Sequence, residues 1–488
     1  MKGTALTLAL VSTPREIASQ LAITTLLEKV PVASSLANAF SEAGYTLALV
    51  GGPVRDAILG RLGNDLDFTT NARPDATKKI LKKWADSTWE PGIAFGTVAG
   101  KKDDLTVEVT TYRSENYDPE SRKPEVNFGD SIEGDLSRRD FTINCLALEL
   151  TTAKPEFIDL FNGVEDLAKK VLRAPGDPDV LFSDDPLRMM RAARFASQLG
   201  FSVDESVVVS MRKMAERIKI VSAERVHDEL VKLLMAPNPR LGLTLMVETG
   251  LADYVLPELP KLKLEVDEHH HHKDVYEHTL TVLEQAIALE DRLGGPNLVN
   301  RLAALLHDIG KPKTRELIPG GGVSFHHHEV VGSRMTKERL RALRFDNETI
   351  ASVSKLVFLH LRFHGYAGGE WTDSAVRRYV RDADDLLDHL HVLTRADCTT
   401  RNQRKAAALA ATYDSLEERI ARLKEEEELN SIRPDVDGNQ IMQILGIPAS
   451  PLVGKAYNHM LELRLEHGPL GEERAIAELK KWWSENGN

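Results

Sequence analysis

Cysteine is almost absent from this chain, because only Cys145 and Cys398 occur among its 488 residues. Two cysteines cannot form a disulfide framework in a chain of this size, so we expect a reducing compartment, the cytoplasm. The sequence also lacks an apolar run near the roughly 18 to 20 residues that a membrane-spanning helix needs. The short run from Ala5 to Val11 has no signal-peptide cleavage pattern. We therefore expect no membrane partner.

An excess of basic residues is also missing, since 62 lysines and arginines stand against 74 aspartates and glutamates. The net charge of −12 excludes a protein that coats nucleic acid by bulk electrostatics, so any nucleic-acid site must be a local patch. Hydrophobic residues at 42% and charged residues at 28% exclude a largely disordered chain.

Length and patterning predict several domains and an α+β fold. The first third alternates β-rich and helical runs, whereas helical periodicity continues from Asp184 to the C-terminus. Strands are predicted at residues 46–50, 66–70, 97–100 and 105–112, with a helix at 54–59. The segment from Pro257 to His272 is rich in proline and histidine and places a boundary near residue 265.

Asp65 and Asp67 stand two residues apart, so on a strand both carboxylates face one side while Leu66 and Phe68 enter the core. Two carboxylates on one rigid strand can hold two Mg²⁺ ions for in-line attack on phosphorus. Glu108, on a neighbouring predicted strand, is a candidate third acid. In isolation, a solvated strand end explains the pair better, and a solvent-facing edge strand explains Glu108 as well.

A glycine-rich turn, Gly51-Gly52-Pro53, precedes these acids where a predicted strand passes into a helix. Glycines let backbone N–H groups approach a polyphosphate, and the helix N-terminus and Arg55 add positive charge. Without Arg55 a plain turn would be the preferred interpretation. Its presence upstream of the two acids favours a nucleotide site.

In their order along the chain, six segments resemble the class II tRNA nucleotidyltransferases, which are the CCA-adding enzymes and the related bacterial poly(A) polymerases. The segments are Gly51–Asp56, Asp65–Asp67, Arg138–Asn144, Asp159–Gly163, Asp184–Arg188 and Arg225–Glu229. The resemblance implies a polymerase-β-like α/β head followed by an all-helical neck, HD domain and tail. With an N-terminal extension, we predict these parts at residues 1–29, 30–173, 174–265, 266–430 and 431–488.

The resemblance also implies roles for individual residues. Asp65 and Asp67 would be the catalytic residues and would bind the Mg²⁺ ions that activate the primer's 3′-hydroxyl and grip the triphosphate. Nucleotide contacts are implied for Gly52, Arg55, Arg139, Asp140, Asn144, Asp185, Arg188, Arg191 and Arg194. The partners would be CTP, ATP and the 3′ end of tRNA.

Asp185 and Arg188 permit a chemical check, because residues three apart on a helix lie on one face. Cytosine and adenine each present an amine donor beside a ring-nitrogen acceptor, which matches one carboxylate and one guanidinium. Guanine and uracil present the reverse order and leave both groups unpaired or opposed. Arg194 is nearly opposite Asp185 on such a helix, so we expect it to reach phosphates or a neighbouring wall, and helix packing explains it equally well.

A long polar segment, residues 112–135, follows the predicted strands of the head. A loop of this length in a compact domain is usually functional or disordered. In the family, a flexible loop at this place is needed to add the terminal A. Its presence here favours complete CCA addition.

A second constellation, of histidines and aspartates, lies in the helical half, where His307 and Asp308 are adjacent at a helix end. It resembles the HD phosphohydrolases. The resemblance implies metal ligands at His278, His307, Asp308 and Asp397, with His328 and His360 as further candidates. His326, His327 and His364 are close enough to leave the last two assignments open. Such ligands suit Mn²⁺, Ni²⁺, Fe or Zn²⁺, and Mg²⁺ less well.

We therefore predict an enzyme that adds C, C and A to tRNA 3′ ends without a template and releases pyrophosphate. A metal-dependent phosphohydrolase activity of the HD domain is a candidate second activity. The alternatives are an enzyme that adds only CC or only A, a poly(A) polymerase, a regulatory protein nucleotidyltransferase with an HD domain, and a non-enzymatic RNA-binding module. The regulatory enzymes have Gly-Ser after the first strand, whereas Gly51 of this chain is followed by Gly52 and Pro53, which counts against that class. The intact Asp65 and Asp67 count against the non-enzymatic binding module. The oligomeric state stays open.

Overall fold

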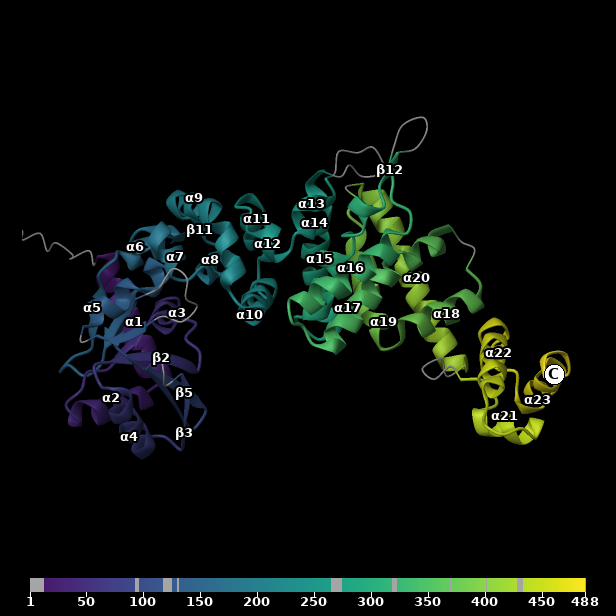
Figure 1. Cartoon of the computed structure of the whole chain (residues 1–488), viewed down its shortest axis with the longest axis horizontal. Helices are drawn as coiled ribbons and strands as arrows, with labels where there is room; N and C mark the ends of the chain where they lie inside the picture. Colours follow the sequence, from purple (N-terminus) through teal and green to yellow (C-terminus); the bar gives the residue numbers. More distant parts are fainter. Residues whose placement is uncertain are drawn as a thin grey trace, which may run out of the picture. The chain divides into compact units, whose positions relative to one another are not determined.

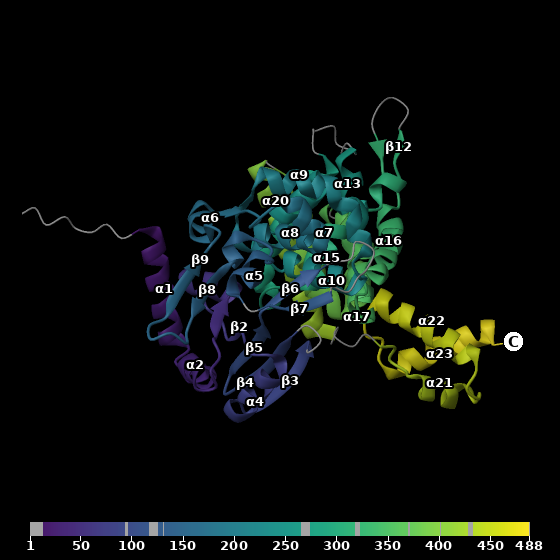
Figure 2. The same cartoon turned by 60° about the vertical axis from the view of Figure 1, so that its left-hand side comes forward.

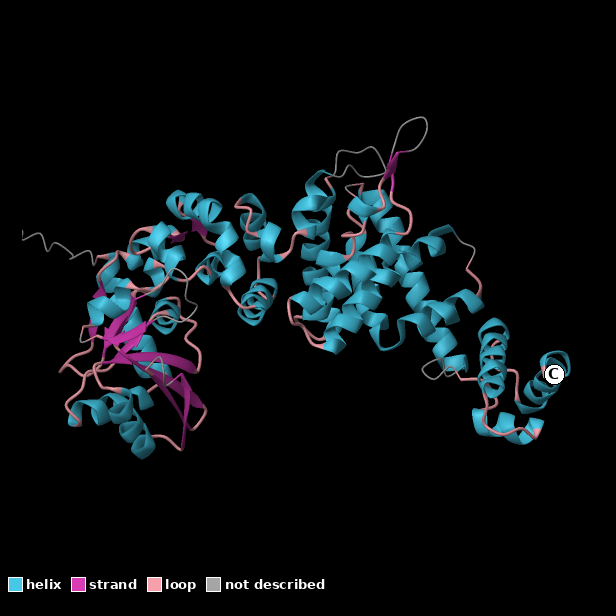
Figure 3. Ribbon diagram, in the orientation of Figure 1, coloured by secondary structure: helices cyan, strands magenta, loops and turns pink. Residues whose placement is uncertain are grey.

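The structure, a computed structural model, describes residues 13–92, 96–116, 125–129, 131–264, 274–317, 323–368, 371–400, 402–427 and 433–487. The chain forms two compact units, Met1–Val255 and Leu256–Asn488. Among the described residues, strands gather in the first unit and the second unit is almost wholly helical (Figure 3). The predicted α+β fold is confirmed.

A seven-stranded mixed sheet forms the centre of the first unit (Figure 1). The strand order is β3-β4-β5-β2-β1-β8-β9. Its strands are β1 (Ala48–Val50), β2 (Asp65–Thr70), β3 (Ser87–Gly92), β4 (Thr97–Lys102), β5 (Leu105–Thr111), β8 (Leu146–Glu149) and β9 (Glu156–Asp159). The β2–β5 pair is parallel, and the other pairs of this sheet are antiparallel. The four predicted strands coincide with β1, β2, β4 and β5, whereas β3, β8 and β9 were not predicted.

Helices of the head pack on this sheet (Figure 2). They are α1 (Pro14–Lys29), α2 (Val32–Glu42), α3 (Gly52–Ile58), α4 (Pro74–Trp84), α5 (Ile132–Ser137) and α6 (Gly163–Lys169). Thr13 and Glu16 begin α1 by satisfying each other's backbone N–H groups. Leu26, Phe40 and Leu66 belong to one buried cluster, so α1, α2 and β2 share a core.

The long polar segment of the head contains a pair of short strands. β6 (Arg113–Asn116) pairs antiparallel with β7 (Glu125–Phe128). Both ends of the predicted loop are therefore extended, and its central residues, 117–124, lie outside the described residues.

The first unit continues with helices that pack beside one another. They are α7 (Pro178–Asp184), α8 (Leu187–Leu199), α9 (Glu205–Met214), α10 (Ala223–Leu234), α11 (Pro239–Glu248) and α12 (Ala252–Val255), with a short parallel pair of β10 (Val171–Leu172) and β11 (Ser202–Val203). Proline disfavours helical backbone at the residue before it, and Asp185, before Pro186, is extended with φ −140° and ψ 101°. The prediction that Asp185 and Arg188 share a helix is wrong, because Asp185 precedes α8.

The second unit is built from helices. They are α13 (Glu258–Lys261), α14 (Val275–Ala288), α15 (Leu298–Leu306), α16 (His328–Ala342), α17 (Asn347–Leu359), α18 (Asp373–Ala383), α19 (Leu387–Asp397), α20 (Gln403–Glu427), α21 (Gly438–Leu445), α22 (Pro451–His467) and α23 (Glu472–Asn486), with a hairpin of β12 (Glu316–Leu317) and β13 (Val323–Ser324). Ile441, Met460 and Leu479 belong to a separate small core of α21–α23. The histidine run 269–272 lies outside the described residues. Within the described chain, every helix is too short or too polar to span a bilayer.

Candidate functional site

Three acids of the head share one electrostatic environment. Asp65 and Asp67 lie exposed on β2 with a buried residue between them, so both carboxylates face one side. Asp67 stands in register with Glu108 of β5. Although the Asp67 side chain reaches solvent, the surrounding protein atoms reduce its hydration, and this raises its pKa; Arg139 lowers the pKa, Asp65 raises it and Arg191 lowers it. Loss of hydration also raises the pKa of Glu108, followed by the charges of Asp67 and Asp65.

These acids fit a divalent cation. Within the part of the chain that the structure describes, no lysine or arginine forms an ion pair with Asp65, Asp67 or Glu108. Neighbouring carboxylates repel one another, and the charges of Arg139 and Arg191 offset this only in part, since the pKa of Asp67 stays raised. A cation bound among the acids would relieve the repulsion. Carboxylate oxygens are the hard ligands that Mg²⁺ prefers. The donor set therefore agrees with the predicted magnesium site.

A chain of hydrogen bonds joins α3, the 3-10 helix η2 (Thr142–Asn144) and α8. Arg55 Nη1 donates to Asn144 Oδ1 at 2.6 Å, and Asn144 Nδ2 donates to Asp140 Oδ1 at 2.9 Å. Arg191 Nε donates to the other oxygen of Asp140 at 2.7 Å. Burial raises the pKa of Asp140, but Arg191 and Asn144 outweigh it and bring that pKa to about 2. The Asp140 carboxylate is therefore ionised and fixed in place.

Gly51 allows an arginine to approach the turn before α3. Its φ of 74° suits glycine, and a Cβ at Gly51 would lie 2.7 Å from Arg139 Nη1. A Cβ at Gly52, the glycine singled out from the sequence, would meet only Arg55 Nη2 at 3.6 Å. Sequence reasoning therefore missed Gly51 as the demanding position, although the Gly-Gly pair signalled it.

The two predicted base-reading groups are each held by another part of the first unit. Asp185 accepts hydrogen bonds from the Leu187 N–H at 3.1 Å and from Arg225 Nη2 of α10 at 2.8 Å. Arg188 Nη2 donates to the Arg138 carbonyl at 2.6 Å. Both groups are thereby oriented by protein contacts instead of by each other.

Arg194 points from α8 to α10. Its Nε donates to Glu229 Oε2 at 2.6 Å, and Arg191 Nη1 lies 4.0 Å from Glu229 Oε1. Glu229 was quoted from the sequence only as the end of a motif. Its position between two arginines was not foreseeable from local spacing.

The six predicted metal ligands of the second unit lie together. They form two sets, His278 with His307 and Asp397, and Asp308 with His328 and His360, and in each set the ligand atoms lie within 4.8 Å of one another. Asp308 links the sets, because its Oδ2 lies 3.2 Å from His307 Nε2 and its Oδ1 lies 3.3 Å from His328 Nε2. His326 and His327 are exposed, so among these neighbours the structure selects His328.

The four histidines direct the same nitrogen inward. His278 Nε2 lies 3.3 Å from His307 Nε2, and His328 Nε2 lies 3.3 Å from His360 Nε2. The outer Nδ1 atoms of His307, His328 and His360 contact the carbonyls of Ala304, Phe325 and Val357 at 2.8, 2.9 and 2.6 Å, and Nδ1 of His278 contacts the Thr399 hydroxyl at 3.0 Å. A carbonyl only accepts, so three Nδ1 atoms carry protons and Nε2 is left for a metal.

Burial and charge act differently on two of these rings. Burial lowers the pKa of His360 to about 3, so that ring is neutral at physiological pH. Burial also disfavours a charge on His307, but Asp308 and Asp397 outweigh it and raise the pKa of His307 to about 9. A bound cation would take the place of the His307 proton between these acids.

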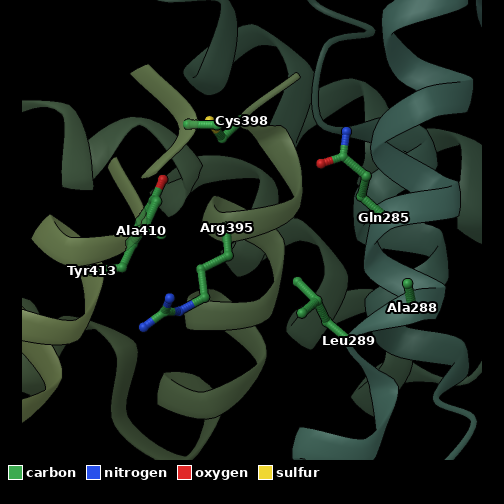
Figure 4. A pocket seen from close by; sticks show the side chains of 8 residues that line it. Gln285, Ala288, Leu289, Arg395, Cys398, Ala410 and Tyr413 are labelled. Carbon is green, nitrogen blue, oxygen red and sulfur yellow. The ribbon is translucent and has the colours of Figure 1, made fainter. Parts of the chain in front are cut away.

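A cavity of about 350 Å³ lies in the second unit (Figure 4). It is lined by Gln285, Ala288, Leu289, Arg395, Cys398, Ala406, Ala410 and Tyr413. Cys398 directly follows Asp397. Arg395 Nη2 donates to Asp414 and Glu417 at 2.7 and 2.9 Å, so its charge is balanced. The cavity therefore has a mainly apolar wall.

Three segments match known families. Residues 47–173 match the poly A polymerase head domain, residues 200–262 the "probable RNA and SrmB-binding site of polymerase A", and residues 275–402 the HD domain. The CCA-adding enzyme of Lactobacillus helveticus is 39% identical over 230 residues, 47% of this chain and 55% of that protein. That of Enterococcus faecalis is 40% identical over 242 residues, 49% of this chain and 57% of that protein. The match spans just over half the length of these curated relatives.

Solved structures extend the likeness in fold. The Bacillus stearothermophilus CCA-adding enzyme in complex with CTP has a TM-score of 0.67 at 24% identity, covering 94% of this chain and 98% of that one. The Thermotoga maritima CCA-adding enzyme complexed with tRNA has a TM-score of 0.62 at 18% identity, covering 95% and 98%. Fold and sites thus define a poly A polymerase head domain followed by an HD domain. These matches confirm the resemblance to the poly(A) polymerase and tRNA nucleotidyltransferase family that was found in the sequence.

Proposed function

We propose that this chain adds C, C and A to the 3′ end of tRNA without a template, using CTP and ATP and releasing pyrophosphate. One observation carries the proposal. Arg191 of α8 binds Asp140, and its charge lowers the pKa of Asp67 of β2, which supports a single site made of α8 and the acids of the sheet. The relatives named CCA-adding enzymes support the choice of substrates. The two unpaired cysteines support the cytoplasm as its compartment.

Asp65 and Asp67 are the proposed magnesium ligands, and Glu108 is the third acid beside them. Bound Mg²⁺ would make the primer's 3′-hydroxyl more acidic and balance the charge of the triphosphate. The strand holds the two carboxylates on one face, which would place the cations on that side of the sheet. The proposed nucleotide contacts are Gly52, Arg55, Arg139, Asp140, Asn144, Arg191 and Arg194.

Asp185 and Arg188 are the proposed base readers. The carboxylate accepts from the exocyclic amine of cytosine or adenine, and the guanidinium donates to the neighbouring ring nitrogen. Arg225 keeps the Asp185 carboxylate oriented, and the Arg138 carbonyl does the same for Arg188. With guanine or uracil the Asp185 carboxylate would face a carbonyl, and the carboxylate and the buried Arg188 guanidinium would each lack a partner on the base.

An extension assay tests the proposal. Purified protein is incubated with Mg²⁺, tRNA that ends at the discriminator base, and each nucleoside triphosphate alone or in pairs, with and without chelator. We expect C from CTP alone, A only after C, and neither G nor U. No incorporation of C and A would overturn the proposal, as would unchanged extension by Asp67→Ala. A stop after CC, runs of A on any RNA, or labelling of a protein would identify the alternative enzymes.

We infer a second activity for the HD cluster, metal-dependent hydrolysis of phosphate esters. The inward Nε2 atoms and two carboxylates carry this inference. Metal-free protein is given Mn²⁺, Ni²⁺, Fe²⁺, Zn²⁺ or Mg²⁺, and bound metal is counted by mass spectrometry before p-nitrophenyl phosphate hydrolysis is measured. We expect His307→Ala to lose both metal and hydrolysis. Equal metal content in this variant would contradict the assignment of the ligands.

A further inference from the structure

One aromatic ring lies beneath three of the proposed nucleotide-binding arginines. Phe195 of α8 is 5% exposed. The guanidinium carbons of Arg55, Arg191 and Arg194 lie 5.3, 5.4 and 4.1 Å from its ring centroid. Significant contacts of a cation with an aromatic face occur only about once per 70 to 80 residues, so three on one ring are an unusual concentration.

Three guanidinium groups around one point repel one another. Each has an acidic neighbour, Asp56 for Arg55, Asp140 for Arg191 and Glu229 for Arg194. Burial lowers the pKa of Arg194 most, Glu229 raises it, and the charge of Arg191 lowers it again. The acidic neighbours therefore offset the repulsion between the guanidinium groups only in part.

An aromatic face offers attraction of a different kind. Its negative quadrupole draws each cation toward the ring without accepting a hydrogen bond from it. A further carboxylate at this place would bind the N–H donors and cancel the positive charge. The ring therefore attracts the guanidinium groups without occupying any N–H donor beyond those that already bind Asp56, Asp140 and Glu229.

We propose that Phe195 is a positioning residue for the triphosphate of the incoming nucleotide. It acts through Arg55, Arg191 and Arg194, whose guanidinium groups it holds in the orientation that binds phosphates. This inference rests on the proposed function, because it takes a nucleoside triphosphate as the ligand of the head.

The experiment measures CTP binding to the full chain by calorimetry, in Mg²⁺ and without tRNA. Phe195→Leu keeps an apolar side chain and removes the ring, and we expect the Kd for CTP to rise roughly tenfold from the loss of three weak contacts. Phenylalanine carrying one, two or three fluorine atoms at position 195 keeps the ring and weakens its negative face stepwise. We expect the Kd to rise with each fluorine, and in extension assays KM for CTP to change more than kcat.

Phe40→Leu is the matched control, since Phe40 is fully buried in α2 within the core cluster of the head. This variant also replaces a buried phenylalanine ring by leucine, but it leaves the ring beneath the three arginines in place. Its CTP affinity should therefore equal that of the wild type. If fluorination leaves the Kd unchanged, or if both leucine variants lose affinity equally, Phe195 is only a packing residue and the proposal is overturned. If the wild type extends tRNA while the Phe195 series shows no trend, this inference alone fails. If the wild type does not bind CTP, the proposed function fails with it.

Discussion

Asp67 combines a raised pKa with the lack of an ion-pair partner in the described chain. Because its folded-state pKa is raised, the ionised carboxylate is less favourable in the folded chain than in the unfolded one. Asp67→Asn should lower nucleotide addition by roughly a thousandfold or more, since metal-ion charge stabilisation is worth several kcal/mol. In chelator its Tm should equal or exceed that of the wild type. Initial rates and thermal melting in EDTA check both parts.

Glu108→Gln is the companion variant, because its carboxyl pKa is raised by the same surroundings. It should also keep or raise the Tm in chelator. A clearly lower Tm for both variants would mean that the two acids stabilise the fold, which would contradict their assignment to a cation-binding site.

The pKa of Asp140 is shifted in the opposite direction from that of Asp67. Its folded-state pKa of about 2 lies below the usual value, so its carboxylate stabilises the fold above about pH 4, and this contribution is lost as the pH falls toward 2. Asp140→Asn should lower the free energy of unfolding by roughly 2 to 4 kcal/mol at pH 7, somewhat less than a fully buried pair because Arg191 is partly exposed. Urea unfolding at pH 7 and pH 3 checks this, and the difference from the wild type should shrink at pH 3.

Glu165→Gln serves as the control for Asp140, because it removes an ion pair with Lys169 in which both side chains are more than half exposed. Its effect on the free energy of unfolding should be too small to measure, because solvent screens the pair. If both substitutions lower the free energy of unfolding equally, the prediction that the Asp140 carboxylate stabilises the fold is contradicted.

At the scale of elements, the turn into α3 can be tested with two glycines that both have positive φ, Gly51 at 74° and Gly60 at 71°. Alanine at either position should destabilise the fold by about 1 to 3 kcal/mol. A Cβ at Gly60 meets nothing within 4 Å, whereas one at Gly51 displaces Arg139. Only Gly51→Ala should therefore weaken CTP binding, measured by calorimetry on the folded variants. Gly52→Ala should keep CTP affinity closer to the wild type.

The elements also show what the sequence could predict. Alternation placed both acids of β2 on one face, because a strand's side-chain direction depends only on local spacing. The helix expected through Asp185 was wrong, although Pro186 was a local signal against it. The contacts of Arg139 with Gly51 and of Arg191 with Asp140 join distant segments, and no periodicity encodes such pairs. In the HD cluster, the order of the family's motifs gave the candidate ligands. The backbone was needed to separate His328 from its neighbour His327, which has φ 61° and an exposed ring.

At the scale of the whole molecule, the two proposed metal sites lie in different compact units, each assembled from residues of its own unit. We expect their functions to separate. In the full chain, His307→Ala should abolish metal retention by the HD cluster and ester hydrolysis while tRNA extension continues, and Asp67→Asn should do the reverse. Bound metal, extension and hydrolysis are measured on the same preparations. Loss of both activities in either variant would show that the sites depend on each other.

The basic residues of α18 contact α22 within the second unit. Arg377 Nη1 donates to the Leu465 carbonyl at 3.0 Å, and Arg378 Nη2 lies 3.3 Å from Glu462 Oε2. Carbonyls near a helix C-terminus attract cations. These arginines therefore help to hold the tail helices on the HD helices.

The outer nitrogens of three HD histidines are anchored on main-chain carbonyls, and this has a consequence for inheritance. A carbonyl is present whichever amino acid the gene encodes at that position. Drift at Ala304, Phe325 or Val357 can therefore change the side chain and keep the tautomer of the ring beside it. The fourth ring, His278, is anchored by the Thr399 hydroxyl, and a single codon change can remove that anchor.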